Sequence, residues 1–211
     1  MIKCIVSACG VVARNAEEKS SHEGNKFISF PLILHLQGKD LTVKELYVTV
    51  AAPGDQTTAQ EFTTGRKVKL NGVMHVRKHN DVVYYNLRTD EPVEFCESTE
   101  KDVLTGKMEF KGKISKNGVK ELKSKTGKDF QAFSAFSSDS DGDKREFTWV
   151  NFFALTPIHN DYFAANKYVE VHGDLILDVF KNELSLSCRV SSVSPWELSN
   201  SNTTTDKKVT I

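Results

Sequence analysis

The segment VEVHGDLIL, residues 169–177, has a counterpart 101 residues earlier in VKLNGVMHV, residues 68–76. Both segments alternate apolar and polar residues around a central glycine, Gly173 in one and Gly72 in the other. Such alternation is typical of a β-strand with one buried face. A glycine inside such a strand indicates a bulge or a bend, as closed β-barrels require. The sequence therefore predicts bent strands at equivalent places in two halves of the chain.

The repeat extends outward from these two strands. GKDFQAFSAF at residues 127–136 matches GNKFISFPLI at 24–33 with an offset of 103, and FTWV at 147–150 matches ELYV at 45–48 with an offset of 102. Small insertions in loops explain the drift of the offset, and self-similarity of this kind indicates tandem copies of one structural unit. The predicted organisation is a first domain at residues 1–100, a linker at 101–106, a second domain at 107–198 and a polar tail at 199–211.

The periodicity within each copy predicts three strands, a short helix and a β-hairpin. In the second copy, Thr156 and Pro157 have the chemistry of a helix N-cap and first position, before a helix over residues 158–165. Gly65 and Asn166 lie at matching positions where a left-handed residue would end that helix. This element order is that of an OB barrel. The predicted fold class is all-β, with two tandem five-stranded Greek-key OB-fold barrels, each with one short helix between strands 3 and 4. The strands are expected at residues 2–13, 27–37, 46–52, 68–76 and 82–88, and at 107–115, 130–137, 147–155, 169–177 and 184–193.

Charge is balanced over the whole chain but not locally. Lys and Arg number 28, as do Asp and Glu, so the formal net charge is zero. Residues 107–128 nevertheless hold eight lysines against Glu109 and Glu121 alone. A neutral protein with a strongly basic face can bind a polyanion, because binding responds to the local potential. The alternative is a solvated lysine-rich surface without a ligand.

Several functional classes are excluded by what the sequence lacks. No apolar run approaches the ~18 residues of a membrane helix, and no signal peptide is evident, so we expect a cytoplasmic protein without a membrane partner. The four cysteines form no C-x-x-C pair and the six histidines form no close group, which argues against a zinc site or a disulfide scaffold. Phosphate-loop, serine-hydrolase and carboxylate constellations are missing too. We therefore expect no enzymatic activity, no metal and no cofactor.

The ordered series KGK at 111–113, the strand 130–137, FTWVNFF at 147–153 and VEVHGDL at 169–175 resembles the bacterial single-stranded DNA-binding protein (SSB) family, in its tandem OB-fold form. The resemblance implies non-sequence-specific binding of single-stranded DNA, without catalysis, in DNA replication, recombination or repair at the nucleoid. It also implies a homodimer that presents four OB folds; the alternative is a monomer, because two folds can already form a continuous path. The acidic C-terminal tail by which the family recruits partners has no counterpart at residues 206–211, so the resemblance leaves recruitment of replication or repair proteins open.

Candidate DNA-binding residues follow from the resemblance and from strand alternation. Trp149 matches a base-stacking tryptophan of the family and Phe180 a hairpin aromatic, while Tyr47 and His79 lie at the corresponding places in the first copy. Alternation puts Phe133 in the core. The other side chains predicted at the interface are Phe130 and Phe136, Asn151 beside Trp149, and the phosphate-binding lysines Lys111, Lys113, Lys123, Lys125 and Lys128.

Two alternatives remain open. One is a protein-interaction module of a replication, conjugation or phage assembly that binds nucleic acid weakly, since OB barrels serve many ligands. The other is a mixed case in which only the second copy binds DNA, because it carries nine of the thirteen phenylalanines and the lysine-rich segment.

Overall fold

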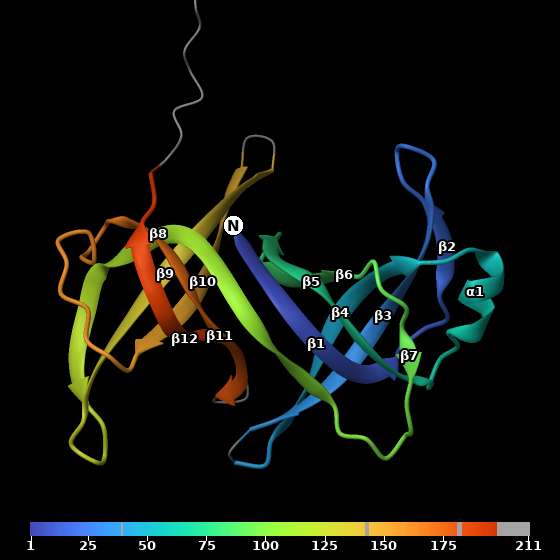
Figure 1. The fold of residues 1–211 in the computed structure, drawn as a ribbon, viewed down its shortest axis with the longest axis horizontal. Coiled ribbons are helices and arrows are strands. Elements are labelled where there is room, and N and C mark those ends of the chain that lie inside the picture. Colours follow the sequence, from blue (N-terminus) through green and yellow to red (C-terminus); the bar gives the residue numbers. More distant parts are fainter. Residues whose placement is uncertain (39, 142–143, 181–182, 198–211) are drawn as a thin grey trace, which may run out of the picture.

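A computed structural model describes residues 1–38, 40–141, 144–180 and 183–197. Figure 1 shows two β-barrels side by side, with β1 and β8 between them. The first barrel closes in the order β1–β3–β4–β6–β5–β1, and the second repeats it as β8–β9–β10–β12–β11–β8. The predicted all-β fold of two five-stranded OB barrels is confirmed. The strands are β1 (Ile2–Val12), β3 (Lys26–Gln37), β4 (Val43–Pro53), β5 (Lys67–His79), β6 (Val82–Arg88), β8 (Val103–Lys123), β9 (Asp129–Asp141), β10 (Lys144–Ala154), β11 (Tyr168–Phe180) and β12 (Glu183–Pro195), with two short additions, β2 (Glu17–Ser20) and β7 (Glu94–Phe95).

Equivalent aromatic residues fill the two cores. Phe30 stacks on Phe62 in the first barrel with ring centroids 5.1 Å apart. Phe133 contacts Phe163 at 5.0 Å in the second barrel and also stacks on Phe152 at 4.7 Å. Phe133 is 5% exposed, so its predicted place in the core is confirmed. The core therefore fixes which face of β9 and β10 is left for a ligand.

The central glycines of the repeated strands sit where two backbones nearly touch. A Cβ on Gly173 would lie 2.1 Å from the Arg189 carbonyl oxygen, and one on Gly72 would lie 2.4 Å from that of Arg88. The pairing of β11 with β12 shifts register between His172 and Gly173, which confirms the predicted bulge in the second barrel.

The helix prediction is right in the first barrel and wrong in the second. Helix α1 (Gln56–Glu61) follows β4 and is capped by Asp55, whose side chain accepts from the Thr58 amide. None of the described residues between β10 and β11 is helical. No helix in the described ranges is long and apolar enough to cross a membrane.

A buried glutamine explains the missing second helix. Gln131 is 4% exposed, and its side-chain amide accepts from the Ile158 amide at 2.7 Å and donates to the Ile158 carbonyl at 3.2 Å. Both backbone groups of Ile158 are thereby used outside a helix. At the equivalent place in the first barrel, Ile28 offers no such groups.

Gly65 and Asn166 do adopt the predicted left-handed conformation, but neither ends a helix. Their φ angles are 87° and 63°. The Gly65 amide donates to the Val12 carbonyl at 2.9 Å, and the Asn166 amide donates to the Ile114 carbonyl at 3.2 Å. Gly65 therefore turns the chain into β5 against the end of β1, and Asn166 turns it into β11 against Ile114, beside the register shift in the middle of β8.

The two barrels share an antiparallel strand pair. β1 pairs with β8 from Ile2 opposite Phe110 to Cys9 opposite Val103, and the repeat makes this pairing pseudo-twofold. Residues 103–106, predicted as part of a linker, are therefore a strand. The backbone amides of residues 103–106 are hydrogen-bonded to β1, whereas those of a linker would be hydrogen-bonded to solvent.

Each barrel also extends a hairpin to the other. In the β5–β6 hairpin, the Asn80 amide donates to Glu146 on β10 at 2.7 Å. In the β11–β12 hairpin, Val179 approaches Gly38 of the first barrel, where a Cβ would lie 3.1 Å from Val179. These reciprocal contacts accompany the pseudo-twofold strand pair.

Candidate nucleic-acid interface

One row of side chains crosses the outer face of the second barrel. Strand register aligns Tyr168 on β11 with Lys113 on β8, Lys113 with Phe136 on β9, and Phe136 with Trp149 on β10. We call these four residues the aromatic row. Their neighbours along the strands, such as Ala135 and Val150, point inward and are buried, so alternation turns the row outward.

The rings of the aromatic row contact one another and remain open to solvent. Phe136 lies 5.0 Å from Trp149 and 5.2 Å from Phe147, measured between ring centroids. Trp149 is 54% exposed and Tyr168 is 38% exposed, whereas Phe136 is half-buried between its neighbours. At the other end of the row, the Lys113 ammonium lies 5.5 Å from the Tyr168 ring. The result is an exposed strip of ring surface with a cation inside it.

Beside the aromatic row lies a second strip with a shallow groove. Asn151 is exposed on the face of Trp149, as predicted, and its side-chain oxygen accepts from the Ser134 hydroxyl at 2.9 Å. The groove has a volume of about 300 Å³, and Asn151, Ser134, Lys120 and the exposed Phe153 are among its lining residues. Flat rings, an amide and a lysine therefore share one open surface.

Phe130 stands at the far end of this face. It is half-buried, and it lies opposite Leu122 of β8. Both residues line an adjoining groove of about 320 Å³, together with Lys123. Phe130 and Phe136 thus occupy the same face of β9, opposite to that of Phe133, as strand alternation predicts.

The predicted lysines differ in how much positive charge they leave available. Lys123, Lys125 and Lys128 are exposed around the β8–β9 turn, with Lys123 3.2 Å from Asp129 in an ion pair at the surface. Lys111 points outward as well, but it lies 3.5 Å from Glu109 and 3.4 Å from Glu170. Two carboxylates balance its charge, so Lys111 contributes less to the positive potential than its place in the sequence indicates.

The corresponding row of the first barrel has one aromatic ring where the second barrel has three. Register aligns Lys67 with Val11, Val11 with Ile33 and Ile33 with Tyr47, and we call these residues the first-barrel row. Tyr47 is 55% exposed, as open as Trp149, but its hydroxyl donates to Glu45 at 2.8 Å, and this bond raises the pKa of Tyr47. Aliphatic side chains stand at the two central positions of this row.

The segment before β8 covers the lysine end of the first-barrel row. Asp102 accepts from the Lys67 ammonium at 2.6 Å, from the His35 amide at 2.8 Å, and meets the His35 ring nitrogen at 2.7 Å. Burial by itself would raise the pKa of Asp102, but the hydrogen bonds from Lys67 and His35 hold that pKa below its usual value. The Lys67 ammonium is therefore paired with Asp102 and largely shielded from solvent.

The two hairpin candidates lie away from the aromatic row. His79 closes the β5–β6 turn opposite Val82, and its ring nitrogen lies 2.9 Å from the Asn80 side-chain nitrogen. Phe180 closes the β11–β12 turn in the equivalent position, opposite Glu183. The Phe180 side chain lies outside the described part of the structure. The β5–β6 hairpin reaches β10, where the Asn80 amide donates to Glu146.

Sequence reasoning did not count Tyr168, Phe147 and Phe153 among the candidate residues, although all three are exposed. Tyr168 aligns with Lys67 in the repeat, so the first copy gave no aromatic signal for it. Phe147 and Phe153 are two and four residues from Trp149, and strand alternation could have placed them on its face. Trp196 also lies next to the row, with its ring 5.9 Å from that of Tyr168.

No family model and no curated protein matches this chain. Solved structures similar to it include the wild-type single-stranded DNA binding protein from Thermus aquaticus, with 11% identity, a TM-score of 0.46, and coverage of 94% of this chain and 95% of that one. Plasmodium falciparum SSB in complex with ssDNA has 20% identity and a TM-score of 0.35, covering 46% of this chain and 96% of that one. The N-terminal domain of PriB from Thermoanaerobacter tencongensis has 18% identity and a TM-score of 0.32, covering 45% and 98%.

Proposed function

We propose that the outer face of the second barrel binds single-stranded DNA without sequence preference. The observation that carries the proposal is the aromatic row, with exposed Trp149 and Tyr168 and a lysine between the rings. Every base has a π-face, so a row of rings can stack on any sequence. Lysines beside the rings supply the cations that follow the phosphates.

The lysines at the β8–β9 turn extend this surface. Lys123, Lys125 and Lys128 lie at the Phe130 end of the face, and Lys113 lies within the aromatic row. A strand crossing from Trp149 toward Phe130 would pass over the groove lined by Asn151 and Lys120. Such a path combines stacking with charge neutralisation, and it needs no catalytic group.

The first barrel is expected to contribute less to DNA binding than the second. Its row offers one ring, Tyr47, which is held to Glu45, and its lysine is bound by Asp102. A carboxylate beside the ring repels phosphates. We therefore assign most of the binding free energy to the second barrel and treat Tyr47 and His79 as minor contacts. The processes that this activity fits are DNA replication, recombination and repair.

We also propose that two chains pair to present four barrels. Ile5 on β1 is 64% exposed and, with Lys3, lines a groove of about 380 Å³ that continues onto β8 and β11. A twofold contact through this face would place Ile5 of one chain against the same face of the other. Light scattering should give about twice the 23.6 kDa chain mass. Ile5→Lys should return the mass of one chain, and a concentration-independent monomer in the wild type would refute the pairing.

The main proposal is tested by titrating the protein into labelled oligo-dT and into a duplex of equal length, each at two salt concentrations. We expect tighter binding to the single strand and an affinity that falls as salt rises. Equal affinity for the duplex, or an affinity independent of salt, would overturn the proposal. Absence of measurable binding to either by folded protein would favour the protein-interaction module instead.

A further inference from the structure

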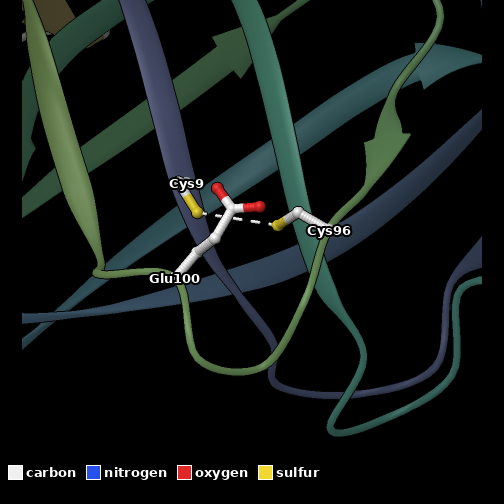
Figure 2. Close-up of side chains that lie close together, drawn as sticks. All are labelled: Cys9, Cys96 and Glu100. Atoms are coloured by element: carbon white, nitrogen blue, oxygen red, sulfur yellow. Dashed lines mark hydrogen bonds between the residues drawn. The ribbon is translucent and has the colours of Figure 1, made fainter.

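Two cysteines that are 87 residues apart in the sequence meet beside the first-barrel row. The sulfur atoms of Cys9 and Cys96 lie 3.7 Å apart. Figure 2 shows Glu100 reaching the same point from the segment that leads to β8. One ligand atom from each of the three residues lies within 4.8 Å of the other two.

The fold holds these side chains from three directions. Cys9 belongs to β1, where it pairs with Lys69 of β5 on one edge and Val103 of β8 on the other. Cys96 follows β7, and its amide donates to the Lys67 carbonyl at 3.1 Å. The Glu100 amide donates to the Glu97 carbonyl at 3.1 Å, which closes the turn that brings Glu100 back over the barrel.

The spacing of the two sulfurs suits a tetrahedral metal ion. Two thiolates about 2.3 Å from a zinc ion, at the tetrahedral angle, stand roughly 3.8 Å apart. The observed distance is 3.7 Å. Both thiols are free and in S–H···S contact, and their sulfurs already stand at the spacing that a tetrahedral ion requires.

The donor set selects the kind of metal. Thiolates favour zinc and softer ions, whereas Mg²⁺ and Ca²⁺ take oxygen ligands. Cys9 is buried, Cys96 is half-buried and Glu100 is exposed, so a fourth position on the solvent side is open to water.

The electrostatic surroundings also fit a cation held by anionic ligands. Two thiolates, one carboxylate and a divalent ion would sum to one negative charge. The Lys67 ammonium is close enough to interact electrostatically with both sulfurs, and it donates to the Glu100 carbonyl and to Asp102. Lys67 therefore lies beside the site, although its charge is already paired with Asp102.

We propose that Cys9, Cys96 and Glu100 bind a zinc ion. With three protein ligands and a fourth position open to water, the ion ties the segment of residues 96–102 to β1 at the place where that segment covers the first-barrel row. The site shares no residue with the aromatic row, so the zinc proposal can be tested separately from the proposal of DNA binding.

The test uses the reduced full-length protein, freed of metal by a chelator and titrated with Co²⁺. One equivalent of Co²⁺ should produce the visible absorption of a tetrahedral ion and a near-ultraviolet thiolate charge-transfer band, and Zn²⁺ should abolish both. Cys96→Ser should remove the charge-transfer band contributed by this pair. Glu100→Gln, at an exposed position, should weaken Co²⁺ binding at least about tenfold, since even the loss of an outer-shell partner has that effect.

Glu97→Gln is the matched control, because Glu97 lies in the same segment and its carboxylate meets Thr99 rather than the sulfurs. It should bind Co²⁺ as the wild type does. Zn²⁺ should raise the melting temperature of the wild type and of Glu97→Gln, and leave that of Cys96→Ser unchanged. Absence of a charge-transfer band in the wild type, its persistence in Cys96→Ser, or unaltered affinity in Glu100→Gln would overturn the zinc site.

Discussion

Trp149→Ala separates a stacking role from a packing role. Stacking on one base contributes about 1–3 kcal/mol, so the dissociation constant for oligo-dT should rise about 5- to 150-fold. Truncating a fully buried aromatic costs ~3–5 kcal/mol of stability. Trp149 is 54% exposed and packs mainly on Phe136, so we expect less than about half of that loss. For a chain of this length, that lowers the melting temperature by several degrees and leaves the protein folded at 25 °C.

The matched control is Tyr47→Ala, because Tyr47 stands at the equivalent position of the first barrel and is 55% exposed. Its affinity for oligo-dT should fall less than about threefold, well under the effect of losing one stacked base. Trp149→Phe should keep most of the wild-type affinity, since a ring remains.

Fluorescence gives an independent readout, because Trp149 and Trp196 are the two tryptophans of the chain. In the Trp196→Phe variant, oligo-dT should quench the emission that remains. An affinity of Trp149→Ala within twofold of the wild type, or equal losses in Trp149→Ala and Tyr47→Ala, would refute the stacking argument. So would unquenched Trp149 emission in a protein with DNA bound.

Three further outcomes are expected. Replacing Lys123, Lys125 and Lys128 by Ala should make the log–log salt dependence of DNA binding less steep by up to about 2, at about 0.7 per phosphate. Lys111→Ala should change this slope little, because Glu109 and Glu170 balance the charge of Lys111, and equal slope changes in the two variants would contradict this reading. Gln131→Ala should lower the free energy of unfolding by about 1–3 kcal/mol in a denaturant titration, because both backbone groups of Ile158 lose their partner; unchanged stability would show that water replaces the amide. The pKa of Asp102 is held below its usual 3.8, so its stabilisation is present above that pH and is lost as pH falls through the lower folded-state pKa; Asp102→Asn should flatten the acid limb of thermal stability, and an unaltered limb would contradict the assignment.

Much of the fold follows from the sequence, because the repeat and the strand periodicity carry it. Alternation correctly separates Phe133 from Phe130 and Phe136, since one face of each strand must enter the core. It also turns Trp149 and Asn151 outward together. These inferences need only local spacing, which a single sequence contains.

The features that could not be predicted depend on contacts between distant segments. The second helix is replaced by irregular structure because Gln131, on another strand, binds the backbone of Ile158. Residues 103–106 form a strand because β1 is available as a partner. The approach of Cys9 and Cys96 requires both the barrel and the turn after β7, so counting cysteine spacings along the chain could not reveal it.

The strand pair between β1 and β8 has a consequence for how the two surfaces can diverge. When two identical chains pair, each substitution is copied onto both surfaces, so neither can change alone. Here the paired barrels are encoded separately and occur in a fixed ratio of one to one. The first barrel can therefore have Ile33 and a lysine, Lys67, that is covered by Asp102, while the second has Phe136 and Lys113 at the equivalent positions. On the proposed DNA-binding function, a strand laid across one chain would therefore meet different chemistry on the two barrels.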